Sequence, residues 1–164
     1  MNIGIISDTH DNMDYIRKAI QRLKEEHVGL VLHAGDYIAP FTAKPYSKLN
    51  AKMIGVYGNN CAETGKLEEA YSEVGCEIRG YFAEVETDGF SIALMHGHRK
   101  KDVDRAYSGD YDVIIRGHTH RSSISRENNV LVINPGEVCG YVSGTHSIAF
   151  LETSKRFSWI SELD

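Results

Sequence analysis

Short apolar runs alternate with amphipathic stretches along the first third of the chain. Continuous apolar runs of this kind predict buried strands. They occupy residues 3–6, 28–32 and 52–57. Between the first two runs, Ile16, Ile20 and Leu23 recur at helical spacing, with charged residues on the opposite face. Either Asp11 or Asn12 is placed to cap this helix. Strands and helices in alternation are typical of parallel α/β winding.

The pattern of predicted elements changes after the first third of the chain. There, pairs of consecutive strands replace the alternation of strands and helices. The dipeptides Asp88-Gly89 and Asn128-Asn129 are placed as hairpin turns between apolar runs. Strands are predicted at residues 77–85, 90–95, 113–115, 124–127, 130–133, 146–151 and 156–160, and helices at 40–49, 63–74 and 102–108. A proline inside the first of these helices would break or kink it. The whole pattern predicts two packed mixed sheets flanked by helices, in one α/β domain over residues 1–164.

Composition and charge are those of an ordinary soluble globular protein. The chain has 164 residues, of which 41% are hydrophobic and 25% charged, enough to bury a core. The formal net charge is -5 and no basic stripe occurs, so stable nucleic-acid binding is not expected. No apolar stretch approaches the length of about 20 residues that a membrane span needs, and the N-terminus lacks the pattern of a signal peptide. Three widely spaced cysteines, Cys61, Cys76 and Cys139, indicate free thiols and a cytoplasmic location.

Aspartate, histidine and asparagine residues follow five of the predicted strands, mostly beside a glycine. These residues are Asp8 and His10, His33 and Asp36, Asn59 and Asn60, His96 and His98, and His118 and His120. In α/β sheets ligands bind at the carboxyl ends of the strands, and glycine lets the backbone approach a ligand closely. Any one of these residues alone is well explained by a turn. For His33 a hydrogen-bonded core position and a place in the site are equally good interpretations.

Seven of these side chains form a set that would be costly to bury without a partner. They are Asp8, His10, Asp36, Asn59, His96, His118 and His120. All offer oxygen or nitrogen donors, which suit Mn²⁺, Fe²⁺, Co²⁺, Ni²⁺ or Zn²⁺. One tetrahedral zinc needs about four ligands, so seven indicate two divalent ions that share a bridging carboxylate. His118 and His120 would then address two ions about 3.5–4 Å apart, with Thr119 only as a spacer.

The same residues fall in short motifs that resemble those of the calcineurin-like metallophosphoesterase superfamily. The motifs are SDTH at residues 7–10, GD at 35–36, GNN at 58–60, HGH at 96–98, GHTH at 117–120 and INPGE at 133–137. The resemblance covers nearly the whole chain and implies a four-layer fold. The residues within these motifs and the length of the chain are most similar to those of the small bacterial and archaeal phosphodiesterases. That branch also resembles the metallophosphoesterase-like subunit of eukaryotic retromer.

The resemblance implies a role for each candidate residue. Asp8, His10 and His120 would hold the first ion; Asn59, His96 and His118 would hold the second; and Asp36 would bridge both. His98 would lie at the rim near the substrate phosphate. Asn60 stands where many members carry a histidine that protonates the leaving group, and an asparagine can only donate a hydrogen bond there. Cys61 replaces an acidic residue of the family and is expected to be a structural thiol.

The expected activity is hydrolysis of small phosphodiesters by a hydroxide that bridges the two ions. Asp36, Asn60 and His98 are the expected catalytic residues, and Asn60, His98 and Arg99 the expected substrate contacts. For Arg99 a solvated helix start is an equally good interpretation. Tyr141 is expected to pack in the core. Without a strong general acid, activated diesters such as aryl phosphodiesters should react fastest.

Three other functions stay open at this point. One is a non-catalytic scaffold like the retromer subunit, although such members have lost metal-site histidines and this chain keeps all seven candidates. Another is a phosphomonoesterase or protein phosphatase. The third is a metallo-β-lactamase-like hydrolase, but its HxHxDH run is absent. Exposed strands could support a homodimer.

Overall fold

Eleven strands form two mixed sheets in the computed structural model, which describes residues 1–164. The first sheet has the order β11 (Phe157–Glu162), β10 (Ser147–Glu152), β1 (Asn2–Ile6), β2 (Leu30–His33), β3 (Lys52–Gly55) and β4 (Cys76–Ile78). The second has the order β5 (Phe82–Thr87), β6 (Phe90–Met95), β7 (Val113–Ile115), β9 (Val130–Pro135) and β8 (Ser122–Glu127). Strands β1 to β4 are parallel, as are β6, β7 and β9, while the remaining pairs are antiparallel.

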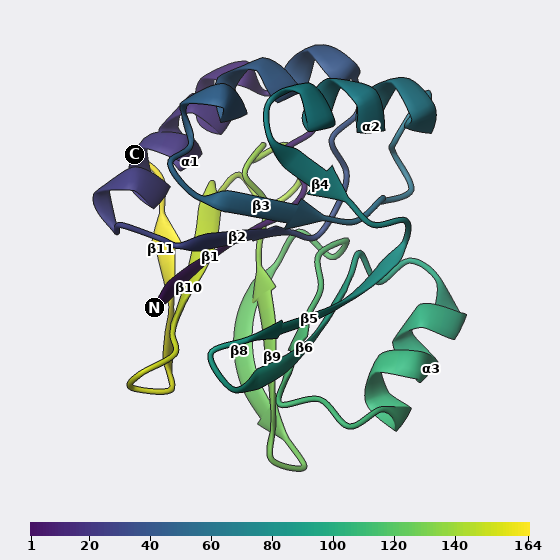
Figure 1. The fold of residues 1–164 in the computed structure, drawn as a ribbon, viewed down its shortest axis with the longest axis vertical. Coiled ribbons are helices and arrows are strands. Elements are labelled where there is room, and N and C mark those ends of the chain that lie inside the picture. The colour runs from purple at the N-terminus through teal and green to yellow at the C-terminus, as the bar shows by residue number, and fades with distance from the viewer.

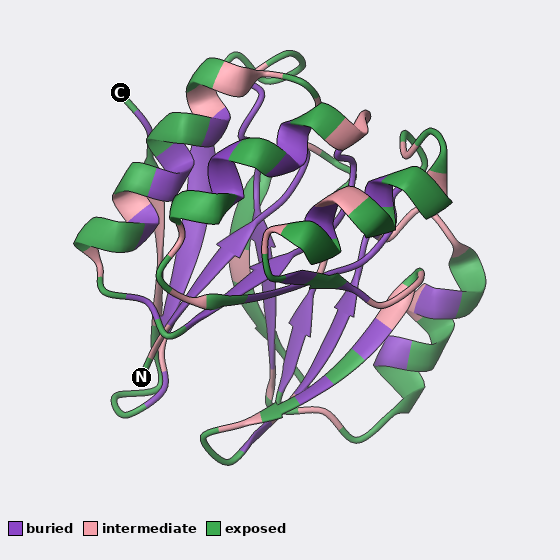
Figure 2. Cartoon of the chain, turned by 45° about the horizontal axis from the view of Figure 1, so that its top comes forward, coloured by how far each residue is buried: buried purple, intermediate pink, exposed green.

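Helices cover the outer face of each sheet (Figure 1). Helix α1 (Met13–Glu25), the 3₁₀ helix η1 (Pro40–Lys48) and α2 (Thr64–Glu73) pack on the first sheet, and α3 (Lys100–Ser108) packs on the second. Asn12 caps α1, because its side chain accepts a hydrogen bond from the Tyr15 N–H. The helices expose their outward faces and bury the faces toward the sheets (Figure 2). No helix combines the length and the apolar character that crossing a membrane would require.

The core consists of an apolar layer between the sheets and one layer under the helices of each sheet. On β1, Ile3 and Ile5 point into the layer between the sheets, where they meet apolar residues of β6 and β7 such as Leu94 and Ile115. Ile6 points the other way and packs under α1 against Ile20. Because both faces of β1 are covered, its sequence is a continuous apolar run rather than an alternating one. This arrangement confirms the predicted four-layer α/β fold.

One predicted strand is wrong, and one predicted helix is of a different type. Residues 77–85 do not form one strand, because β4 and β5 belong to different sheets and the chain crosses between them at residues 79–81. Gly80 has a φ of 63°, which turns the backbone at this crossing. The predicted helix over residues 40–49 is present as a 3₁₀ helix over residues 40–48, and Pro45 inside it has no N–H for an α-helical hydrogen bond.

Candidate metal centre

The site lies where loops from the two sheets meet at the carboxyl ends of their parallel strands. Backbone hydrogen bonds join the loops of the first sheet, from Asp8 N to Gly35 O (3.0 Å) and from His10 N to Asp36 O (2.9 Å). A further bond crosses between the sheets, because the His118 N–H donates to Asp8 Oδ2 over 3.1 Å. The strand order therefore brings distant parts of the sequence to one edge, as expected for a ligand site in an α/β fold.

The structure brings all seven predicted ligands together. Oδ1 of Asp8 lies 3.4 Å from His120 Nε2 and 4.0 Å from His96 Nε2. Oδ2 of Asp36 lies 3.5 Å from His96 Nε2 and 3.7 Å from His10 Nε2. Asp36 thus stands between histidines that belong to the two different predicted ion positions, which is the place required of a bridging carboxylate.

Asn59 and His118 complete the second group. Asn59 Oδ1 lies 3.0 Å from His96 Nε2, and the His118 ring centroid lies 5.1 Å from that of His96. His96 Nδ1 donates to the Ala34 carbonyl over 2.7 Å, so a neutral His96 directs a lone pair from Nε2 toward Asn59 Oδ1. Two acceptors facing each other need a cation or a proton between them.

Buried polar atoms without partners test whether a cation fits. Asp8 Oδ1 and His10 Nε2 are both buried and neither has a hydrogen-bond partner, and Asp8 is fully inaccessible to solvent. Leaving such atoms unpaired typically costs about 1–3 kcal/mol each. Ligand atoms of Asp8, His10 and Asp36 lie within 4.8 Å of one another. The residues present therefore fit divalent ions.

Five of the seven predicted ligands have left-handed backbone conformations. The φ angles are 50° for Asp8, 45° for His10, 61° for Asp36, 70° for His118 and 59° for His120. This conformation is unfavourable for residues other than glycine and typically costs about 1–3 kcal/mol. It turns each side chain sharply away from the preceding strand toward the site, and strain of this kind is concentrated at functional sites.

Two glycines are required for the close approach of the carboxylates. A Cβ atom at Gly58 would clash with Asp36 Oδ1, and one at Gly117 would clash with Ser7 Oγ and lie 2.7 Å from Asp8 Oδ2. Any larger residue at either position would push a carboxylate out of place. The glycines of the GNN and GHTH motifs are therefore part of the site geometry.

The two carboxylates have opposite electrostatic environments. Burial raises the pKa of Asp8 above its usual value and outweighs the nearby His96 and His120 imidazoles. Burial acts in the same direction on Asp36, but His96 and two hydrogen bonds from Asn60 outweigh it and hold the pKa of Asp36 well below its usual range. Those bonds run from Asn60 N to Oδ1 (2.8 Å) and from Nδ2 to Oδ2 (2.9 Å).

The histidines also differ in protonation. Burial lowers the pKa of His96, but the Asp36 and Asp8 carboxylates outweigh it, so its pKa lies above the usual value. Burial and the neighbouring His96 lower the pKa values of both His98 and His118. His98 and His118 are therefore neutral near pH 7, whereas His96 retains a proton to higher pH.

Two supporting residues were not assigned a role from the sequence. Glu137, the last residue of the INPGE motif, accepts a hydrogen bond from His120 Nδ1 over 2.6 Å and others from the Val142 and Ser143 N–H groups. Asn134 of the same motif donates Nδ2 to Thr119 Oγ1 over 2.9 Å. Thr119 is thus more than a spacer, because its hydroxyl fixes the loop that carries the two histidines.

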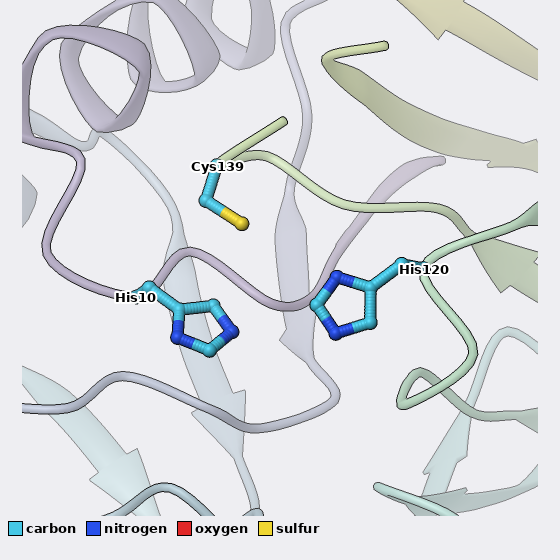
Figure 3. Close-up of side chains that lie close together, drawn as sticks. All are labelled: His10, His120 and Cys139. Atoms are coloured by element: carbon cyan, nitrogen blue, oxygen red, sulfur yellow. The ribbon is translucent and has the colours of Figure 1, made fainter. Parts of the chain in front are cut away.

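Cys139 also lies at the site, although no thiolate was predicted there. Its Sγ points between the rings of His10 and His120 (Figure 3). Ligand atoms of these three residues lie within 4.8 Å of one another. Cys139 is 1% exposed, its Sγ–H donates to Glu137 Oε2 over 3.1 Å, and burial raises the pKa of its thiol. The sequence offered no signal for this position beyond its place after INPGE.

The predicted substrate contacts lie at the rim. The His98 ring centroid is 5.3 Å from that of His96, and His98 Nδ1 has no hydrogen-bond partner. The Arg99 guanidinium stacks 4.3 Å from the Tyr81 ring centroid and forms a 3.2 Å ion pair with Asp102 at the start of α3. Arg99 is therefore anchored beside His98 rather than free in solvent.

Two further predictions are decided by the structure. Tyr141 does not pack in the core: it is 61% exposed, and its ring centroid lies 6.0 Å from that of His10. The loop after β9 passes over the site instead of into the core, and this places Tyr141 at the rim.

His33 is a core residue, since it is fully buried, Nδ1 accepts from the Gly35 N–H and Nε2 lies 3.2 Å from Thr9 Oγ1.

Cys61 has the surroundings of a structural thiol. Its Sγ accepts a hydrogen bond from the Gly58 N–H over 3.2 Å, next to the GNN loop. Burial raises the pKa of the Cys61 thiol, so the group is protonated at neutral pH. Both observations agree with the predicted structural role.

Residues 1–156 match the calcineurin-like phosphoesterase superfamily domain. The chain belongs to this superfamily. A phosphodiesterase of Methanocaldococcus jannaschii is 44% identical over 158 residues, which make up 95% of this chain and 95% of that protein. The solved structure of an archaeal phosphodiesterase has a TM-score of 0.93 and 42% identity, and the match covers 99% of this chain and 100% of that chain. These relatives confirm the predicted small prokaryotic branch and the prediction that the chain is a phosphoesterase.

More distant solved structures share the fold alone. The structure of Vacuolar Protein Sorting 29 from Cryptosporidium parvum has a TM-score of 0.71 at 18% identity, and the match covers 99% of this chain and 97% of that chain. The four-layer arrangement is therefore common to proteins whose sequences have diverged widely from this one.

Proposed function

We propose that this phosphoesterase hydrolyses small phosphodiesters with two divalent ions, held by the seven residues that the strand ends bring together. The observation that supports this most is the pair of unpartnered buried atoms, Asp8 Oδ1 and His10 Nε2, beside the Asp36 carboxylate. A purely structural site would have no reason to leave these atoms unpaired. The 44% identical phosphodiesterase supports the choice of diesters.

Each ion position has its own residues. Asp8, His10 and His120 would hold one ion, and Asn59, His96 and His118 the other, while Asp36 lies near both groups. When bound, the ions would activate a water molecule as the nucleophile and neutralise negative charge on the phosphoryl group. Mn²⁺, Ni²⁺, Fe²⁺, Co²⁺ and Zn²⁺ all suit the nitrogen and oxygen donors of this set.

The remaining residues orient the substrate. Asn60 is held by its two hydrogen bonds to Asp36, which leaves one amide hydrogen free to donate to a phosphoryl oxygen. His98 has a lowered pKa and is neutral, so it also donates or accepts a hydrogen bond at the rim. Neither side chain is a strong acid near pH 7. The leaving oxygen must therefore depart without much protonation, which favours leaving groups of low pKa.

The alternative of a non-catalytic scaffold rests on the fold shared with Vacuolar Protein Sorting 29. The complete set of seven ligand side chains and the strained backbone at five of them favour catalysis, because a scaffold gains nothing from either. The phosphomonoesterase alternative has no specific observation in its favour.

A metal-reconstitution assay tests the proposal. The chelated protein is loaded with Mn²⁺ or Ni²⁺ and offered an aryl phosphodiester and the matching aryl monoester. We expect close to two ions per chain by metal analysis, no turnover without metal, and a kcat/KM for the diester at least about tenfold higher, or roughly 1.4 kcal/mol in transition-state free energy. Two bound ions with no hydrolysis of either ester would favour the scaffold, and a preference for the monoester would favour the phosphomonoesterase.

A further inference from the structure

The thiol of Cys139 lies beside two of the residues that would hold the first ion. Its Sγ and ligand nitrogens of His10 and His120 lie within 4.8 Å of one another. Figure 3 shows the sulfur directed into the space between the two rings. Ligand atoms on one tetrahedral ion, at bonds of about 2.0–2.3 Å, lie about 3.3–3.8 Å apart. Side-chain rotations that shorten the present separations by no more than about 1.5 Å would therefore let all three atoms bind one ion.

The backbone holds Cys139 firmly in this place. Its N–H donates to Asp8 O over 3.0 Å, and its carbonyl accepts from Asn12 Nδ2 over 2.9 Å. The preceding Val138 N–H donates to Ser7 O over 3.1 Å. These three bonds attach the loop after β9 to the segment between β1 and α1, which carries Asp8. The position of the sulfur is thus set by the same segment that positions the first ion.

Two buried polar atoms of neighbouring residues lack hydrogen-bond partners, and this is a second observation that points to a bound cation. Asp8 Oδ1 and His10 Nε2 have none, and Asp8 is fully buried. A cation beside His10 would satisfy both atoms, since His10 belongs both to the group with Asp8 and Asp36 and to the group with His120 and Cys139. The thiol therefore belongs to a cluster of possible metal ligands, and this distinguishes it from Cys76, which lies among apolar residues of the core under α2.

We propose that the Cys139 thiolate is a ligand of the ion that His10 and His120 hold, and that it makes this position select zinc over manganese. The inference rests on the metal centre of the proposed function. On binding, a Zn–S bond forms, the S–H bond breaks and the proton leaves to solvent, with the Glu137 carboxylate that accepts the S–H bond as its first acceptor. A thiolate favours Zn²⁺, whereas nitrogen and oxygen donors alone leave Mn²⁺ competitive. The other position, with Asn59, His96 and His118, offers no sulfur.

X-ray absorption at the zinc edge tests the ligand without any substitution. The wild-type protein is loaded with zinc at one equivalent per chain, and the distances to the surrounding atoms are measured. We expect one sulfur at about 2.3 Å together with nitrogen and oxygen atoms at about 2.0–2.2 Å. A zinc environment of nitrogen and oxygen only, with zinc bound at full occupancy, would overturn the proposal.

A matched pair of cysteine variants tests the selectivity. Cys139→Ser removes the sulfur, while Cys61→Ser changes a thiol that contacts the Gly58 N–H on the other side of the site. In Cys139→Ser we expect the sulfur-to-cobalt charge-transfer absorption of the Co²⁺-loaded protein to vanish and the preference for zinc over manganese to fall about tenfold or more, as for loss of a metal-ligand interaction. Cys61→Ser should keep both. Unchanged absorption and preference in Cys139→Ser would contradict the proposal.

Diester hydrolysis by the same wild-type preparations separates this inference from the proposed function. If the protein hydrolyses diesters but its zinc has no sulfur ligand, the proposed function is supported and ligation by Cys139 is refuted. Sulfur ligation in a protein that hydrolyses no diester would do the opposite.

Discussion

His120 donates its Nδ1–H to Glu137 Oε2 over 2.6 Å, and this bond turns the lone pair of Nε2 toward Asp8. The pKa of Glu137 is lowered to about 2, because hydrogen bonds from Ser143, Cys139 and His120 outweigh the effect of burial. The carboxylate is therefore ionised at any pH at which the enzyme would work. A carboxylate behind a metal-binding histidine fixes the tautomer and makes the imidazole a stronger ligand.

Glu137→Gln is expected to weaken metal binding. The amide has nearly the same shape, but it is neutral and cannot accept from both His120 and the loop N–H groups at once. We expect a loss of about 10–100-fold in metal affinity or in activity at limiting metal, by titration with Mn²⁺ or Zn²⁺. Excess metal should restore part of the activity. Glu127→Gln, which changes an exposed glutamate on β8, is the control and should bind metal as the wild type does. Equal affinities in the two variants would contradict the role of Glu137.

Asp36→Asn should abolish turnover. Asp36 lies near histidines of both ion positions, and an amide would place its NH₂ against the Asn60 side-chain NH₂ that now donates to the carboxylate. We expect a fall in kcat of at least about 10³-fold, on the scale seen when a group central to catalysis is removed. Asp112→Asn, whose carboxylate accepts from the Ser91 N–H at the surface, controls for the general effect of losing a charge. Retained turnover in Asp36→Asn would refute the bridging assignment.

Asn60→His should change how the rate depends on the leaving group. The wild type has no strong acid at this position, so log kcat should fall steeply as the pKa of the leaving phenol rises. An imidazolium in place of the amide can protonate the leaving oxygen, and the dependence should become shallower, with slow diesters gaining about tenfold or more. Kinetics over a series of aryl diesters measures both slopes. Parallel slopes would show that Asn60 lies away from the leaving group.

His33 makes the metal-free protein sensitive to acid. Burial lowers the pKa of His33 from 6.5 to about 3, so the unfolded chain takes up a proton between these values that the folded chain does not. The contribution of neutral His33 to the free energy of unfolding is fully present above about pH 6.5. It is lost progressively as the pH falls toward 3, by at most about 1.4 kcal/mol per pH unit.

His33→Asn isolates this contribution, because the asparagine oxygen can still accept from the Gly35 N–H. Urea unfolding in the presence of a chelator, between about pH 4 and pH 8, should give a smaller loss of unfolding free energy toward acid for the variant. Above about pH 7 the two pH dependences should coincide, since His33 is then neutral in both states. Identical dependence throughout the acid range would show that His33 is protonated equally in the folded and unfolded chains.

The convergence of the residues that follow the strands could be predicted from the sequence, because parallel strands place their carboxyl ends at one edge of a sheet. Asp8, Asp36 and His96 come within about four residues of the ends of apolar runs, and this placement predicts that they converge. The positions of Glu137, Cys139 and Tyr141 could not be predicted in this way. They lie in the irregular segment after β9, whose path is set by hydrogen bonds to the end of β1 rather than by any periodic pattern. The crossing at Gly80 was missed because residues on both sides of it have strand-like sequences.

The candidate ligands belong to both sheets, with Asp8 and Asp36 on loops of the first and His96 and His118 on loops of the second. Because each proposed ion position draws ligands from both sheets, bound ions would tie the two halves of the molecule together at one end, in the way that a covalent cross-link would. At the opposite end the halves are joined by apolar packing and by Asp88 in the β5–β6 turn of the second sheet, which forms a 3.2 Å ion pair with the Met1 amino group and accepts a hydrogen bond from Thr153 Oγ1 over 2.7 Å. Core substitutions there, far from any phosphate, should reach the chemistry by letting the sheets slide and so altering the separation of the two ions.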